Sequence, residues 1–125
     1  MKFFLILAFC LSLYAGHGEK REHHINKDLT YLELSQAQIE NFKEVLKKFQ
    51  HEMEEFREFK EAITAKKKAL FLKEPLDTNA LNALNQALYE KASKEENKIL
   101  LRIHNILSPE QRGAFVQYFE EWEVR

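Results

Sequence analysis

The chain has 125 residues and a formal charge of −1 at pH 7, because 19 basic residues nearly balance 20 acidic ones. At roughly 150 residues per domain, this length allows one domain. With 3 glycines, 2 prolines and 31% charged residues, the composition suits long helices and argues against sandwiches, barrels and glycine-rich nucleotide-binding folds. The balanced charge gives no net field to attract nucleic acid or anionic lipid, although local lysine clusters could still matter. The single cysteine, Cys10, excludes an internal disulfide framework or a cysteine zinc site.

The amino terminus has the pattern of a secretory signal peptide. Lys2 precedes the mostly apolar residues 3–14, and small residues follow at Ala15, Gly16 and Gly18. This apolar run is well short of the roughly 20 residues that a membrane-spanning helix needs. We therefore expect cleavage near residues 15–18, a periplasmic protein without cysteine, and no transmembrane anchor after processing. An uncleaved anchor is the alternative.

Beyond the signal peptide, residues 1–18, the chain divides into two parts. Residues 19–33 lack apolar periodicity and lie beside the new terminus, so we expect a mobile N-terminal tail. Residues 34–125 carry apolar residues at helical spacing and are predicted to form one helical domain.

The first predicted helix is long. A capping box at Ser35 and Gln38 predicts that it begins at Gln36. Neither Gly nor Pro interrupts the following heptad pattern before Pro75, so the helix should continue to about Leu72. The heptad positions are occupied by Ile39, Phe42, Leu46, Phe49, Met53, Phe56, Ile63 and Leu70.

A turn and a second helix should follow. Pro75 disfavours helix at the residue before it, and Asp77 or Thr78 can cap a second helix over about residues 79–106. A hairpin is the economical arrangement of the two helices. The polar residues 93–98 lie in the middle of the second helix and are expected to loosen its seam with the first.

A short last helix is predicted at the carboxyl end. Ser108 and Gln111 form a second capping box, and Pro109 occupies the first helical position, where its missing N–H costs nothing. This helix should run to about Trp122 and present one apolar face to the hairpin.

Two segments share the pattern Leu-Ser-x-x-Gln, and each precedes a predicted helix. Their shared residues are Leu34, Ser35 and Gln38 in the first, and Leu107, Ser108 and Gln111 in the second. Helix caps of this kind are common and alone indicate no function. Together with the export signal and the long hairpin, they make residues 34–122 resemble the Spy/CpxP group of periplasmic envelope-stress proteins, which is related to CnrX-like sensors and ZraP-like chaperones. The resemblance implies an all-α long helical hairpin with a short hooking C-terminal helix, commonly a homodimer.

The resemblance also implies two kinds of function. In the first, the protein holds unfolded or stress-damaged periplasmic clients without ATP, or restrains a membrane sensor kinase. In the second, it binds copper, zinc or nickel for metal sensing or resistance. We take the first as the main expectation and the second as the alternative; a purely structural dimer is a third possibility.

The metal ligands of the sensor-type relatives are not carried over. Aligned on the two motifs, their positions are occupied here by Ile25, Leu29, Leu46 and Ile99. The candidate ligands that remain are His23, His24, His51, Glu55 and His104. Imidazole nitrogens suit borderline metals, and His17 would join a copper site if cleavage followed Ala15. Because selective sites need three or four donors, solvated histidines that bind nothing are the alternative.

The aromatic content is high for a protein with little interior volume, since the full chain has 10 phenylalanines. We expect a client-binding or dimer surface, and intramolecular packing is the alternative. Its candidate residues are Phe42, Phe49, Phe56, Phe59, Phe115, Phe119 and Trp122. The lysines at 47–48 and 66–68 could border such a surface, although such lysines more often form a solvated helix face.

No enzyme signature is present in the sequence. It has no glycine-rich phosphate loop, no nucleophile elbow and no His-Glu-x-x-His motif, and both Ser35 and Ser108 are occupied as helix caps. We therefore expect a binding protein and no catalysis.

Overall fold

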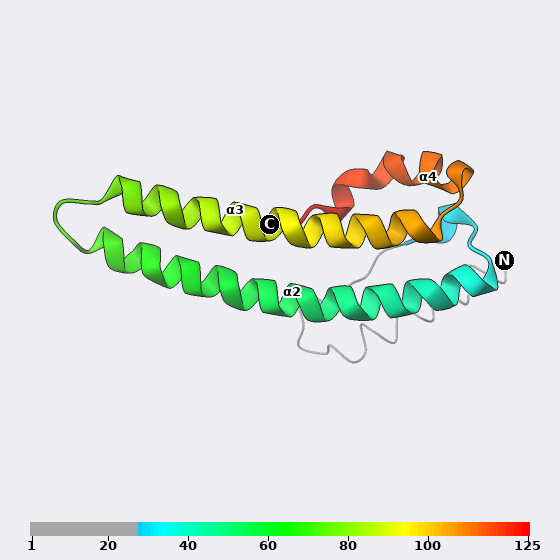
Figure 1. Ribbon diagram of the computed structural model, residues 1–125, viewed down its shortest axis with the longest axis horizontal. Helices are drawn as coiled ribbons and strands as arrows, with labels where there is room; N and C mark the ends of the chain where they lie inside the picture. The colour runs from blue at the N-terminus through cyan, green and yellow to red at the C-terminus, as the bar shows by residue number, and fades with distance from the viewer. Residues whose placement is uncertain (1–27) are drawn as a thin grey trace.

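The computed structural model describes residues 28–125, so the predicted signal peptide and most of the predicted tail lie outside the described residues. The elements in chain order are η1 (Thr30–Leu32), α2 (Gln36–Phe71), α3 (Thr78–Ile106), α4 (Pro109–Phe115) and η2 (Val116–Trp122). Helices α2 and α3 form a long antiparallel hairpin, and α4 with η2 folds back over its base (Figure 1). The predicted all-α hooked hairpin is confirmed.

Both long helices begin where their caps predicted. Ser35 is the N-cap of α2, whose 36 residues give a length of about 54 Å at 1.5 Å per residue. Asp77 is the N-cap of α3, where its Oδ1 atom accepts the backbone N–H of Ala80 at 3.0 Å. No helix of residues 28–125 is long and apolar enough to cross a membrane.

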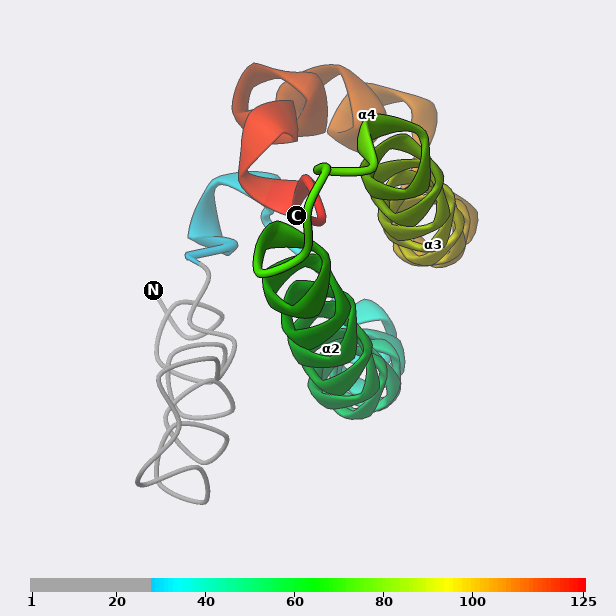
Figure 2. The same cartoon turned by 90° about the vertical axis from the view of Figure 1, so that its left-hand side faces the viewer.

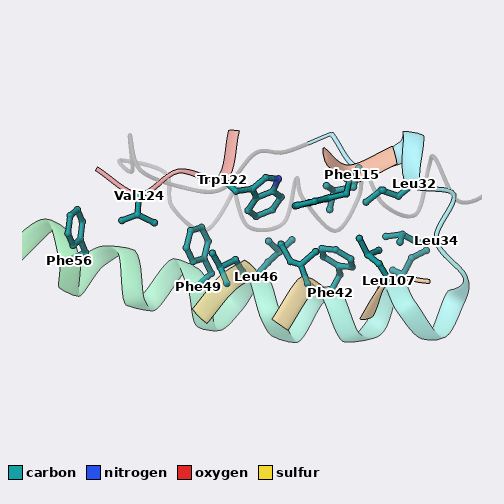
Figure 3. Close-up of a cluster of buried hydrophobic side chains, with 14 of the residues drawn as sticks. Leu32, Leu34, Phe42, Leu46, Phe49, Phe56, Leu107, Phe115, Trp122 and Val124 are labelled. Carbon is teal, nitrogen blue, oxygen red and sulfur yellow. The ribbon is translucent and has the colours of Figure 1, made fainter. Parts of the chain in front are cut away.

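The predicted heptad describes the inner face of α2. Six of its residues are buried, at 5% exposed or less: Ile39, Phe42, Leu46, Phe49, Phe56 and Ile63. The burial is uneven along the hairpin, because Ile63 is the only buried residue between positions 57 and 91. The packed core therefore lies at the base of the hairpin, under the hook (Figure 3).

The expected loosening of the hairpin at residues 93–98 is wrong. Ala92, Glu95 and Ile99 lie one helical turn apart on the inner face of α3, and all three are buried. The polar residue among them is held by lysines on its own helix, as described below. Helices α2 and α3 therefore stay packed together at this level, with the Glu95 carboxylate buried between them.

The last predicted helix reaches the expected residue but is not one helix. Helix α4 ends at Phe115, and the tighter turns of η2 continue to Trp122 with a break at Tyr118, whose backbone angles are φ −122° and ψ 28°. The break redirects the chain across the hairpin (Figure 2). As a result the Trp122 ring lies 6.2 Å from that of Phe49 on α2 and is 2% exposed.

The tail predicted to be mobile up to residue 33 is wrong at its carboxyl end. Leu29, Leu32 and Leu34 are 1–2% exposed and belong to the core under the hook. Asp28 accepts hydrogen bonds from the backbone and hydroxyl of Thr30, which fixes the start of η1. The segment is too short to show periodicity, so the sequence pattern could not separate these leucines from a tail.

Candidate functional site

The two Leu-Ser-x-x-Gln motifs lie side by side at the base of the hairpin. Their glutamines, Gln38 and Gln111, form what we call the glutamine pair. Gln38 Nε2 donates to Gln111 Oε1 at 2.7 Å, and Gln111 Nε2 donates back to Gln38 Oε1 at 3.0 Å. Because the two residues are 73 positions apart, the repeated motif is one joined structure rather than two separate helix starts.

The glutamine pair uses its full hydrogen-bonding capacity. Each Oε1 also accepts the backbone N–H of its own N-cap, Ser35 at 2.9 Å or Ser108 at 2.8 Å. The spare donor of the first glutamine reaches the carbonyl of Ile106 at 3.0 Å, and that of the second reaches the carbonyl of Leu32 at 3.1 Å. An amide offers two donors and two acceptor sites, so the pair is saturated. It ties together η1, α2, the end of α3 and α4.

A second polar structure crosses the hairpin above the base, and we call it the charged ladder. Arg102 on α3 donates to both carboxylate oxygens of Glu52 on α2, at 2.8 and 3.0 Å. Lys98 lies 3.2 Å from Glu52 and 3.0 Å from the buried Glu95, which also pairs with Lys91 at 3.4 Å. The sequence analysis missed these pairs, since the partners across the hairpin lie 50 positions apart.

The charged ladder shifts the pKa values of Glu52, Lys98 and Arg102 toward the ionised forms. Burial of Glu52 opposes its ionisation, but hydrogen bonds from Arg102 and Lys98 outweigh burial and lower its pKa below the ordinary 4.5. The hydrogen bond to Glu95 raises the pKa of Lys98, and the one to Glu52 raises that of Arg102. Glu52, Lys98 and Arg102 therefore stay charged at neutral pH, where their contacts stabilise the middle of the hairpin.

We expect Glu52→Gln to lower the free energy of unfolding by about 2 kcal/mol at neutral pH, because Arg102 loses its carboxylate partner and Lys98 loses one of its two in a partly buried site. The sign of the pH dependence follows from the lowered pKa of Glu52: its stabilisation is complete above 4.5 and is lost as pH falls through the folded-state value. The gap between wild type and variant should therefore shrink on acidification, as measured by urea unfolding at several pH values. A gap that stays constant contradicts a role for the ionised carboxylate.

The base also carries a tyrosine pair, in which Tyr31 is half-buried and Tyr118 is 43% exposed. The rings of Tyr31 in η1 and Tyr118 in η2 lie 4.5 Å apart between centroids. Burial, followed by the charge of Glu121, raises the pKa of Tyr31 to about 12, and its hydroxyl has no hydrogen-bond partner among residues 28–125. This group is therefore a neutral packing residue at physiological pH.

The histidines in the described part of the chain lie on the surface. His51 Nε2 lies 3.3 Å from a carboxylate oxygen of Glu55, and their side chains are 74% and 62% exposed. His104 is exposed near the end of α3, and its backbone carbonyl accepts two hydrogen bonds from Arg112, at 3.1 and 2.9 Å. Within residues 28–125 no group of three or more His, Cys, Asp or Glu side chains is placed to hold a metal ion. His51 with Glu55 thus remains a two-donor pair.

The other histidines that the sequence analysis named are not placed. His17, His23 and His24 lie outside the described residues. Their role as ligands therefore rests on the sequence.

The candidate aromatic surface is mostly core. Five of its members are buried inside this chain: Phe42, Phe49, Phe56, Phe115 and Trp122. These five therefore pack within the chain, as the alternative had it. Phe115 and Trp122 belong to the hook, where their rings lie 5.8 Å apart, and they pack toward the aromatic side chains of α2 (Figure 3). Only Phe59 and Phe119 reach solvent; Phe59 is half-buried with the Lys91 ammonium 6.0 Å from its ring, and Phe119 is 40% exposed.

The comparisons with known proteins bear on this arrangement. The model of a family described as heavy-metal resistance matches residues 3–114, which is most of the chain. This chain belongs to the heavy-metal resistance family. The match runs from the amino-terminal segment through both long helices into α4, so it includes both of the joined motifs. Neither the search of curated proteins nor that of solved structures gives a match.

This chain departs from the sensor-type relatives at the positions where the resemblance implies ligands. Leu29, Leu46 and Ile99 occupy three of them and are 1%, 2% and 0% exposed. All three belong to one apolar cluster, so these positions carry packing in this chain instead of metal donors. The fourth, Ile25, lies outside the described residues.

Proposed function

We propose that this protein acts in heavy-metal resistance or sensing in the periplasm, as a binding protein and not as an enzyme. It would bind copper, zinc or nickel through the adjacent His23 and His24, ahead of the hooked hairpin. The observation that carries the proposal is the family match, which covers both this histidine segment and the hairpin. Export through the predicted signal peptide at residues 1–18 is part of the proposal.

The donor chemistry supports the choice of His23 and His24. Imidazole nitrogen suits copper, zinc and nickel, and adjacent histidines with the neighbouring Glu22 carboxylate bring three donors within a short stretch of chain. On the described helices, the sensor-type ligand positions are apolar, and the His51–Glu55 pair offers two donors. We therefore place the stronger site in the amino-terminal segment and a weaker one at His51.

Calorimetric titration with Cu(II), Zn(II) and Ni(II) tests the proposal. For the purified exported chain we expect one equivalent of metal bound with micromolar affinity or better, and a loss of at least about tenfold in the His23→Ala, His24→Ala double variant, because a selective site needs both imidazoles. His51→Ala is the matched control and should leave the affinity unchanged. Binding that survives the double variant but is lost in His51→Ala would move the site to α2. No binding by the wild type would contradict the metal role.

A second candidate is the holding of unfolded clients, or restraint of a sensor, that the Spy/CpxP resemblance implies. The observation in its favour is the number of large apolar side chains that α3 and the hook expose. Tyr89 is 70% exposed, Leu101 61% and Val116 57%. Exposed apolar side chains are candidates for interaction with other proteins, including a second copy in a homodimer. An aggregation assay separates this role from metal binding. In it, less than one equivalent of the protein is added to an unfolded model client, without ATP and without metal, and suppression of client aggregation supports the holding role.

A further inference from the structure

The distal tip of the hairpin exposes apolar side chains that the core does not explain. Phe71 is 73% exposed and Leu72 85% at the end of α2, and Leu76 in the connecting turn is 39% exposed. An open groove of about 630 Å³ connects Phe71 and Leu72 with Leu81 on α3. Together these residues form a continuous apolar surface, which we call the tip surface.

Lysines surround the tip surface. Residues 64–77 contain four lysines against two acidic residues, Glu74 and Asp77, whereas the whole chain has a formal charge of −1. Lys66, Lys68 and Lys73 are exposed, and none of them makes an ion pair with another of residues 28–125. Lys67 donates to Asn85 Oδ1 at 2.8 Å and so helps to hold α2 against α3. The tip is thus apolar at its end and positively charged behind it.

The shape of the tip decides what kind of partner fits it. The tip is the narrow end of an elongated hairpin, far from the hook (Figures 1 and 2). A stable protein interface buries about 800 Å² on each partner, which a few side chains at the end of a rod do not offer. A lipid surface needs no matching shape: it takes aromatic and aliphatic side chains into its interface and attracts nearby lysines to its phosphates.

We propose that the tip surface docks on membranes rich in anionic phospholipid. Phe71 and Leu72 enter the headgroup region, and Lys66, Lys68 and Lys73 contact lipid phosphates. The hairpin then stands on the membrane by its tip, with the base held away from the lipid. This inference does not depend on the proposed metal binding.

A tryptophan reporter tests where the chain touches the membrane. The native Trp122 is 2% exposed in the core, so a second tryptophan at Phe71→Trp supplies the signal that changes on binding. With vesicles of phosphatidylglycerol and phosphatidylcholine in equal parts, we expect a blue shift and quenching by brominated lipid. Leu101→Trp, at an exposed position on α3, is the matched control and should show neither. A response at Leu101→Trp equal to that at Phe71→Trp would overturn tip docking.

Vesicle co-sedimentation of the exported chain tests which residues supply the affinity, and mass spectrometry first confirms that the apolar residues 3–14 are absent. The double variant Lys66→Gln, Lys68→Gln should bind about 25-fold more weakly, at about fivefold per lysine near an anionic surface. Lys47→Gln, Lys48→Gln removes two exposed lysines nearer the base and should bind as the wild type does. Equal losses in the two double variants would overturn the proposal in favour of diffuse charge attraction.

The apolar part has its own variant. Phe71→Ser, Leu72→Ser should weaken vesicle binding at least about tenfold without unfolding the chain, because both side chains are exposed. An unchanged far-ultraviolet circular dichroism spectrum checks the fold. Wild-type chain that binds neither anionic nor neutral vesicles overturns the proposal. So does a double variant that binds vesicles normally but shifts from dimer to monomer in analytical ultracentrifugation, since the tip surface would then contact a second copy.

Discussion

Replacing Trp122 with alanine is expected to lower the free energy of unfolding by about 3–5 kcal/mol, the usual cost of removing a large buried aromatic side chain. Trp122 is 2% exposed and lies against Phe49 of α2 and Phe115 of α4, so its loss leaves a cavity between the hook and the hairpin. Urea unfolding followed by circular dichroism measures the effect, because the variant has no tryptophan fluorescence. This is a large part of the 5–15 kcal/mol typical of a small domain.

The matched control for this change is Phe119→Ala. Phe119 lies in the same η2 segment but is 40% exposed, with its ring edge-on to Phe115 at 6.3 Å. Its loss should cost less than about 1 kcal/mol, since surface substitutions have small effects. Similar costs at the two positions would show that the hook is an appendage whose docking adds little to the stability of the hairpin.

We expect Gln38→Glu to destabilise the chain by about 2–3 kcal/mol, although glutamate is an accepted third residue of a capping box. If residue 38 acted only in the cap of α2, the change would leave the free energy of unfolding the same or raise it by about 0.3–1 kcal/mol, because a negative charge near a helix N-terminus is favourable. In this structure glutamate loses both donors of the first member of the glutamine pair, to Gln111 and to the carbonyl of Ile106. The sign of the change in unfolding free energy therefore separates a local cap from the joined motifs.

Acid provides the control for Gln38→Glu. The new carboxylate faces two oxygen acceptors, so its folded-state pKa should rise above the unfolded-state value of about 4.3. The penalty should therefore shrink as pH falls through the folded-state pKa and be smallest once pH is below the unfolded-state value. A double-mutant cycle with Gln38→Ala and Gln111→Ala should give a coupling energy of about 1–3 kcal/mol, as expected for residues in one hydrogen-bond network. Additive effects of the two alanine substitutions would contradict a joined pair.

Much of the fold was predictable because local chemistry decides it. Ser35 and Asp77 satisfy the first N–H groups of their helices, and these caps placed the starts of α2 and α3 to within one residue. The heptad pattern likewise identified the buried face of α2, since a helix can hide only one stripe of apolar residues. These features depend on neighbours a few positions apart, which a sequence pattern shows directly.

The parts that the sequence did not reveal all depend on distant partners. Two identical caps at Ser35 and Ser108 give no sign that their glutamines meet, and the contact of Glu52 with Arg102 is visible only once α2 and α3 are aligned. The apolar face of the last helix was expected to cover the hairpin, but the sequence did not show which aromatic side chains it would bury, because the break at Tyr118 sets where η2 crosses. For the candidate site, the sequence named every histidine but could not show that His51 and His104 stay apart from further donors.

Because the buried side chains are concentrated at the base, the hairpin is fixed at one end and free at its tip. The hydrogen bonds of the glutamine pair hold η1, α2 and α4 together at the base. Between positions 57 and 91, in contrast, one side chain, Ile63, is buried. Thermal opening should therefore start at the free end and travel inward, because the free end has the least packing to lose. A force applied to the free end is transmitted along α2 and α3 to the base, so displacement of the tip strains the contacts of η1 with the glutamine pair.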